Sequence, residues 1–209
     1  MAAAPISRQA EAQFWDNVAE CSRFFIGTSN VDRALTKLVT ELENAQVPYA
    51  IAGAMALNEY GYRRVSDEIA ILLTPAGLAG FKAEVLGRGY LEKFAGSKGL
   101  HDTENNVVID VLRAGDFPGD GKPKAVSFPN PQLVARRGSR GAYLPLAMLI
   151  QLKLASGISS LHRLKDLSDV LELVKAAAVP KSLVSELDAS VQSKFIELWN
   201  AAQIHDVDY

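Results

Sequence analysis

Two acidic residues, Glu68 and Asp110, belong to short apolar stretches that have the composition of strands. Glu68 opens the stretch 68–73, and Asp110 lies inside the stretch 106–112. An unpaired charge inside an apolar strand is unfavourable, so we expect Asp110 to face a cleft or an ion-pair partner. Alternate strand residues point to the same face, and carboxylates that share a cleft are the oxygen ligands that Mg²⁺ prefers. Cation binding is therefore the chemistry that these side chains can support.

A second feature precedes Glu68 along the chain. The predicted strand 47–52 ends at Gly53, a helix of small residues follows from Ala54 to Tyr60, and an Arg-x-Ser triplet, Arg64–Ser66, leads to Glu68. Glycine lets the backbone come close to a ligand, and the amides at a helix N-terminus can approach phosphates. This order of strand, glycine turn, helix and acidic strand is the most informative pattern in the chain.

That order of features resembles the nucleotidyltransferase superfamily with the polymerase-β-type palm. In particular, the chain looks like small bacterial nucleotidyltransferase-like proteins related to abortive-infection toxins, which carry a small-residue glycine turn, then Arg-x-Thr, then Asp-x-Asp in an apolar strand. The segments that carry the resemblance are Ala50–Leu57 and Tyr60–Leu73, and weaker motifs extend it over residues 30–203. The resemblance implies an α/β fold, with a mixed sheet of the nucleotidyltransferase type, flanking helices and a C-terminal helical region.

The resemblance also implies a site for a nucleoside triphosphate and Mg²⁺. Carboxylates at i and i+2 of one strand, with a third on a neighbouring strand, can hold two Mg²⁺ ions that bind the triphosphate, activate a hydroxyl and stabilise the leaving oxygen. Glu68 and Asp110 match the first and third positions, as candidate catalytic and metal-binding residues. In the related toxins a lysine on one helix and an Asp-x-x-Asp pair on the next line the cleft, which match Lys153 and the pair Asp166 and Asp169.

The same resemblance assigns the nucleotide-binding positions. The backbone of the glycine turn is expected to approach the phosphates, and basic side chains are expected to supply positive charge. The candidates are Gly53, Ala54, Arg64, Ser66 and Lys122. Lys122 belongs to a Gly/Pro-rich segment, residues 114–131, whose length is typical of a functional loop or an ordered lid.

One position departs from the pattern of that family. The second strand carboxylate falls on Ala70, which cannot bind a cation. Asp67 does not replace it, because adjacent strand residues point to opposite faces. Glu68 and Asp110 alone can hold one Mg²⁺ ion that keeps several of its water ligands. Two carboxylates are too few to hold two metal ions well. We therefore expect phosphoryl transfer to be lost or greatly weakened.

Each candidate also has an ordinary structural explanation. Gly53 can simply end a strand, Arg64 can be a solvated surface charge, and Glu68 can be a strand-edge acid. Lys153 interrupts an apolar helix and can lie on its exposed face. These alternatives stay open at the level of sequence.

The Asp-x-x-Asp pair is open to the same explanation. Asp166 and Asp169 share a helix face, where they can form a solvated pair or can pair with Arg163 and Lys165. The histidines are scattered and show no spacing typical of a zinc site.

The elements that must position these residues divide the chain into three predicted parts. Residues 1–28 are rich in aromatic residues, and we expect an N-terminal helical extension that packs on the body. Residues 29–144 are predicted to form the nucleotidyltransferase-like α/β core, and residues 145–209 a C-terminal helical region packed on it. The predicted strands are 47–52, 68–73, 90–95 and 106–112, and the predicted helices include 31–42, 54–60, 78–86, 146–155, 164–174 and one or two within 181–203.

Composition excludes several classes of protein. Of the 209 residues, 48% are hydrophobic and 22% charged, which is typical of a folded domain and excludes bulk disorder. With 22 Lys+Arg against 24 Asp+Glu, the net charge of -2 argues against a general binder of duplex DNA, although not against local phosphate binding. The single cysteine, Cys21, permits neither an intramolecular disulfide nor a cysteine-based zinc site. No apolar stretch has the length of a membrane span or a signal peptide, so a cytoplasmic location is predicted.

Three functions are compatible with these observations. The first is a nucleotidyltransferase-like pseudoenzyme, weak or inactive in transfer, that binds a nucleotide or a partner. The second is an active, toxin-like, Mg²⁺-dependent nucleotidyltransferase acting on RNA such as tRNA, on protein or on a small-molecule hydroxyl. It requires that one metal suffices or that Asp166 or Asp169 replaces the missing ligand. The third is a non-catalytic partner-binding protein, such as one half of a toxin–antitoxin pair.

Overall fold

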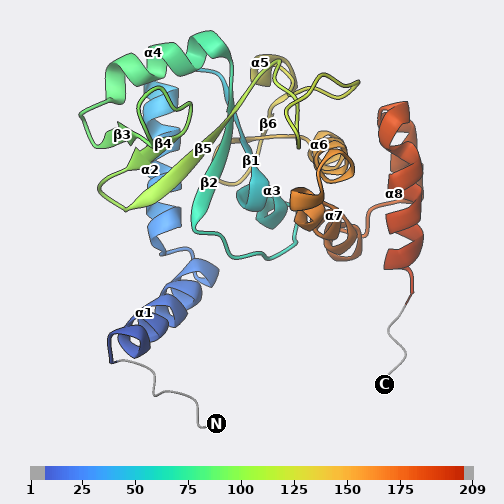
Figure 1. The fold of residues 1–209 in the computed structure, drawn as a ribbon, viewed down its shortest axis with the longest axis horizontal. Helices are drawn as coiled ribbons and strands as arrows, with labels where there is room; N and C mark the ends of the chain where they lie inside the picture. The colour runs from blue at the N-terminus through green and yellow to red at the C-terminus, as the bar shows by residue number, and fades with distance from the viewer. Residues whose placement is uncertain (1–7, 205–209) are drawn as a thin grey trace.

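The computed structural model describes residues 8–204, with side chains from residue 13 onward (Figure 1). Its centre is a seven-stranded sheet in the order β3-β4-β5-β2-β1-β7-β6. The strands are β1 (Tyr49–Ala52), β2 (Glu68–Leu73), β3 (Tyr90–Glu92), β4 (Leu100–Asp102), β5 (Val107–Arg113), β6 (Arg136–Arg137) and β7 (Ala142–Tyr143). The α-helices are α1 (Arg8–Phe25), α2 (Asn30–Asn44), α3 (Gly53–Glu59), α4 (Pro75–Val85), α5 (Pro131–Val134), α6 (Leu146–Ser159), α7 (Leu164–Ala176) and α8 (Ala189–Ala202), with 3₁₀ turns η1 (Leu161–Arg163) and η2 (Lys181–Glu186).

The sheet is mixed in direction. β2 runs parallel to β5 and antiparallel to β1, while β1 runs parallel to β7. The outer pairs β3–β4, β4–β5 and β6–β7 are antiparallel. The predicted fold class, a mixed α/β sheet with flanking helices and a C-terminal helical region, is confirmed.

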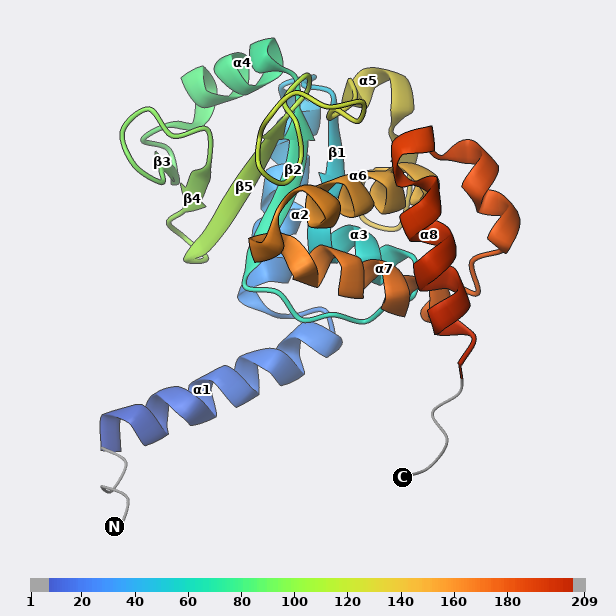
Figure 2. The ribbon, with the colours of Figure 1, turned by 45° about the vertical axis from the view of Figure 1, so that its right-hand side comes forward.

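The helices cover the two faces of the sheet. α2 begins with a capping box, in which the Ser29 hydroxyl accepts a hydrogen bond from the Asp32 backbone N–H and the Asp32 carboxylate accepts one from the Ser29 backbone N–H. Its apolar stripe, which includes Leu35, Leu38 and Leu42, packs on the strands and is almost fully buried. Figure 2 shows α2 behind the strands and α6 and α7 in front of them. The inner strands are therefore covered on both sides.

Helix α6 is apolar on most of its surface because it packs in the interior. Its neighbours are the sheet on one side and α7 and α8 on the other (Figure 2). With 14 residues it has the length of a buried core helix. None of the helices within residues 8–204 combines the length and the apolar character that a membrane crossing needs.

Element boundaries differ from the predictions where the local pattern is short. β1 begins at Tyr49 and β3 ends at Glu92, both shorter than predicted. β4, β6 and β7 were not predicted, since strands of two or three residues carry no readable alternation. Residues 181–203 form a 3₁₀ turn and one α-helix rather than one continuous helix.

The first helix contacts the body at its C-terminal end. Phe24 of α1 packs against the core, and Glu20 accepts a hydrogen bond from the Asn30 backbone at 2.5 Å. The rest of α1 projects away from the sheet in both views (Figures 1 and 2), and Phe14 is 56% and Trp15 60% exposed. The helix expected in this segment is therefore present, with less of it packed on the body than expected, while residues 1–7 and 205–209 lie outside the described residues.

Two phenylalanines allow a test of the core at the β3 edge. Phe81 of α4 is fully buried, with its ring edge-on to Tyr90 of β3 at a centroid distance of 6.1 Å, whereas Phe94 is 67% exposed. We expect Phe81→Ala to lower the free energy of unfolding by about 3–5 kcal/mol, because it removes buried surface and leaves a cavity. Phe94→Ala is expected to change it by less than about 0.5 kcal/mol. Urea unfolding followed by circular dichroism measures both, and equal losses would contradict this packing.

Candidate functional site

A cavity of about 260 Å³ lies between the sheet and the C-terminal helices. Its floor comes from β1, β2 and β5, and its sides come from the start of α3, from α6, and from the junction of η1 and α7. The predicted site residues among its lining are Gly53, Ala54, Arg64, Ser66, Glu68, Asp110, Lys153 and Asp166. Residues far apart in the sequence are therefore brought to one site. Of the predicted set, Lys122 does not line the cavity.

Strand register sets the floor. Ala52 of β1 pairs with Ala70 of β2, and Ala70 pairs with Asp110 of β5. These three residues thus lie in a row across adjacent strands, and all three line the cavity. Glu68 is two residues before Ala70, so its side chain leaves β2 on the same side. The methyl group of Ala70 therefore lies on the same side of the sheet as the Glu68 and Asp110 carboxylates, next to Asp110 on the neighbouring strand.

Gly53 and Ala70 are in close contact at the edge of this floor. Gly53 has a φ of +58°, and a Cβ built on it would lie only 2.8 Å from the Cβ of Ala70. Any larger residue at position 53 would be strained and would collide with β2. Gly53 therefore has a steric reason to be glycine.

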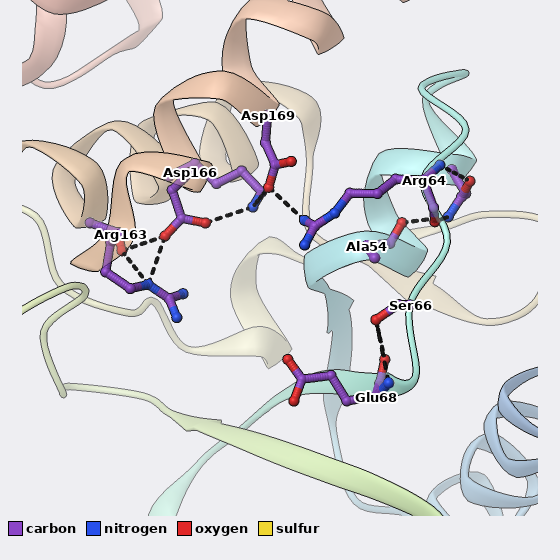
Figure 3. A network of polar contacts seen from close by, with 10 residues as sticks. Ala54, Arg64, Ser66, Glu68, Arg163, Asp166 and Asp169 are labelled. Atoms are coloured by element: carbon purple, nitrogen blue, oxygen red, sulfur yellow. Dashed lines mark hydrogen bonds and ion pairs between the residues drawn. The ribbon is translucent and has the colours of Figure 1, made fainter. Parts of the chain in front are cut away.

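The two acids of the floor are not paired with protein groups. Within residues 13–204, neither the Glu68 nor the Asp110 carboxylate makes a hydrogen bond or an ion pair. Ser66 Oγ donates a 2.9 Å hydrogen bond to the backbone carbonyl of Glu68 rather than to its carboxylate. Figure 3 shows that carboxylate pointing into the space beneath α7, on the side where Arg163 lies.

The donors of the floor fit one hard cation rather than two. The part of the chain that the structure describes holds no group of three or more His, Cys, Asp or Glu side chains able to bind a metal ion. Two carboxylates can hold one Mg²⁺ whose remaining positions are filled by water.

Lys153 is buried in the wall that faces this floor. It is 8% exposed, and its Nζ lies 2.9 Å from Asp166 Oδ1 and 2.7 Å from Asp169 Oδ2. One ammonium group of α6 is thus held by two carboxylates of α7. Burial of a lysine is tolerated when it is paired in this way. The aspartates therefore form a buried ion-pair network and not the solvated pair that their spacing allowed.

The network continues to either side of Lys153 (Figure 3). Arg64 donates to Asp169 Oδ2 at 2.6 Å, while Ser156 Oγ and Arg163 Nε donate to Asp166 Oδ2 at 2.6 and 2.9 Å. Asn58 of α3 also holds the Arg64 backbone, with one hydrogen bond to its N–H and one to its carbonyl, both 2.9 Å. The segment that leads into β2 is therefore tied to α3 at its backbone and to α7 at its side chain.

Asp166 is held in its charged form by these partners. Burial raises the pKa of the Asp166 carboxyl, but the charge of Lys153, hydrogen bonds from Ser156 and Lys153, and the charge of Arg163 together outweigh burial and lower it. An acid with this environment is an ion-pair partner of Lys153 and Arg163, and both of its oxygens already accept a hydrogen bond.

The long loop after β5 closes one side of the cavity. Pro118, Gly119 and Phe128 line it. Gly119 has a φ of +76°, and a Cβ built there would lie 2.6 Å from the Ser156 carbonyl oxygen, so the loop backbone rests directly on α6. The loop is therefore ordered against the helix.

The structure adds three basic residues that were not predicted as site residues. His162, Arg163 and Lys165 line the cavity at the junction of η1 and α7. In the sequence, residues 162–165 gather these three basic side chains directly before Asp166. That cluster beside a predicted site residue is the signal that could have pointed to them.

Comparisons with known proteins give similarity to solved structures but none to a family model or a curated sequence. Among solved structures the chain is similar to ANT(2")-Ia, in its crystal structure in complex with adenylyl-2"-tobramycin. The sequence identity is 13%, the match covers 79% of this chain and 94% of that chain, and the TM-score is 0.49. A likeness at this level assigns neither substrate nor activity to this chain.

The pH dependence of stability tests the buried network. Because the folded-state pKa of Asp166 is below its ordinary value of 3.8, its contribution to stability is present above pH 3.8 and is lost as pH falls below that value. We expect Asp166→Asn to be less stable than the parent by roughly 1–3 kcal/mol at pH 7. The difference should shrink as pH falls below 3.8 in urea titrations. Asp67→Asn, at an exposed position, is the control and should show no such convergence.

Two loop glycines test how the loop rests on α6. Gly119 and Gly121 both have positive φ, but only Gly119 has α6 within 4 Å of a built Cβ. We expect Gly121→Ala to lower the free energy of unfolding by about 1 kcal/mol, from backbone strain alone. Gly119→Ala should cost about 1–3 kcal/mol more, because its methyl group collides with the helix. Equal losses in thermal unfolding would show that the loop does not depend on this contact.

Proposed function

We propose that this chain is a nucleotidyltransferase-like protein with an incomplete metal site, which binds a nucleotide in the cavity and is weak or inactive in nucleotidyl transfer. The observation that carries the proposal is Ala70, a methyl group that pairs with Asp110 across β2 and β5 and lies two residues after Glu68, at the position where the family that the sequence resembles has its second strand carboxylate. When bound, Mg²⁺ would neutralise phosphate charge beside Glu68 and Asp110. Two protein carboxylates supply too few ligands to hold a second metal ion.

The buried network supports the proposal of an incomplete metal site. Asp166 and Asp169 are the acids that would have to replace the missing metal ligand, and both are already paired with Lys153. Releasing Asp169 would take the ion-pair partner from Arg64, and releasing Asp166 would take it from Arg163. Either change would leave Lys153 with one carboxylate instead of two. Rescue of the metal site by α7 is therefore unfavourable.

The active enzyme remains the alternative within the same class. It requires that one Mg²⁺ suffices, and its acceptor would be an RNA such as tRNA, a protein or a small-molecule hydroxyl. The relation to abortive-infection toxins and the cytoplasmic location remain predictions of the sequence.

A non-catalytic, partner-binding role is favoured by one observation of its own. α1 stands off the body with Phe14, Trp15 and Phe25 exposed. Apolar side chains gathered on a projecting helix are typical of a surface that contacts another protein. This role is compatible with nucleotide binding in the cavity.

Thermal unfolding with each nucleoside triphosphate, with and without Mg²⁺, tests the proposed function. A ligand at 100 times its Kd adds roughly 2.7 kcal/mol to the stability of the folded state. Stabilisation without label transfer from the nucleotide supports the proposal. Mg²⁺-dependent label transfer would establish the active enzyme, and absence of any stabilisation would leave the partner-binding role.

Ala70→Asp tests the incomplete metal site directly. We expect this variant to lose roughly 1–3 kcal/mol of stability in EDTA, because three carboxylates then share the floor, and to regain it on addition of Mg²⁺. Ala70→Asn is the matched control, of equal size and without charge, and should not respond to Mg²⁺. Differential scanning calorimetry measures both variants. A Mg²⁺ response as large in the parent chain as in Ala70→Asp would contradict the incomplete site.

A further inference from the structure

The cations that the sequence assigned to phosphate binding are mostly held by other groups or lie outside the cavity. Arg64 gives one guanidinium nitrogen, Nη1, to Asp169, and Lys153 is held by both aspartates of α7. Lys122 does not line the cavity. Within residues 13–204, Arg64 alone of this set lines the cavity with guanidinium nitrogens that have no partner, so further positive charge for an anionic ligand must come from other residues.

At the junction of η1 and α7, Arg163 and Lys165 supply that charge and His162 adds an imidazole that can donate a hydrogen bond. His162, Arg163 and Lys165 all line the cavity and all are exposed. Within residues 13–204, the side chains of His162 and Lys165 make no hydrogen bond or ion pair. Arg163 uses only Nε, toward Asp166 and Ser156, so its two terminal nitrogens stay available. Figure 3 shows those nitrogens turned away from α7, into the space on the Glu68 side.

The acids of the floor lie across the same cavity from this basic wall. No ion pair joins Glu68 or Asp110 to His162, Arg163 or Lys165 in the described part of the chain. Because these acidic and basic side chains line one cavity without pairing with one another, they can bind a ligand that has separate cationic and anionic parts. A divalent cation bound to a phosphate chain is such a ligand. Carboxylates take the cation, and a guanidinium group with two free nitrogens suits phosphate oxygens.

We propose that His162, Arg163 and Lys165 form a subsite for a phosphate chain, opposite Glu68 and Asp110. The shared ligand chemistry is a di- or triphosphate, supplied by a nucleotide or by free polyphosphate. Only the nucleotide part of this inference rests on the proposed function, because the basic wall can bind a phosphate chain without recognition of a nucleoside. In this arrangement Lys153 stays bound to Asp166 and Asp169, holds α7 in place against α6, and does not contact the phosphates.

Isothermal titration calorimetry on the full chain tests the subsite, with ATP, inorganic tripolyphosphate and adenosine as probes in Mg²⁺. The test variant combines His162→Gln and Lys165→Gln, whose side chains have no partner within the described residues, so the fold is not perturbed. Arg163 stays in place because Asp166 depends on it. Arg88→Gln removes a charge from an exposed position outside the cavity lining and is the matched control. Urea midpoints equal to that of the parent confirm that the variants are folded.

We expect the parent chain to bind ATP and tripolyphosphate but not adenosine. The double variant should bind both phosphate ligands roughly tenfold more weakly, since each partly exposed ion contact is worth a factor of about three. Arg88→Gln should bind as the parent does. Added salt should weaken the parent more than the double variant, because fewer charges remain to be screened in the variant.

The other outcomes separate the subsite from the proposed function. ATP binding that is unchanged in the double variant overturns the subsite and leaves the proposed function standing. Binding of tripolyphosphate without ATP, lost in the double variant, supports the subsite and overturns the nucleotide-binding function. Absence of binding to either phosphate ligand overturns both.

Discussion

Lys153 is buried between Asp166 and Asp169, and the wall of the cavity depends on this ion pair. An ammonium group removed from water is stable only with its carboxylates in place, so α6 and α7 are held in one relative position. Arg64 joins the same network and ties the segment before β2 to α7. The distance between the floor and the helical wall is therefore set by buried charge as well as by apolar packing.

This network also distributes charge within the cavity. Lys153 and the two aspartates of α7 neutralise one another, and Arg64 gives one guanidinium nitrogen to Asp169. The other ionisable side chains of the lining are an acidic floor, Glu68 and Asp110, and a basic wall, His162, Arg163 and Lys165. A cavity with separated charges of both signs favours a ligand that carries both, and it orients that ligand.

The floor of the cavity is built by strand register and apolar packing rather than by its charged residues. β2 is central in the sheet, and its residues on the opposite face, such as Ile69 and Ile71, are fully buried. The close approach of Ala70 to Gly53 holds the glycine turn against β2. The position of the floor therefore does not depend on the carboxylates of Glu68 and Asp110.

The sequence by itself determined the strands that carry Glu68 and Asp110, because short apolar stretches are a local property. The mixed α/β class followed from the family resemblance of those segments, and the structure confirms it. Only the tertiary structure decided that Lys153 is buried, that α1 stands off the body, and that residues 162–165 face the acids. These depend on contacts such as that of Arg64 with Asp169, which are 105 positions apart. Helix spacing places two aspartates on one face, but it does not state what packs against that face.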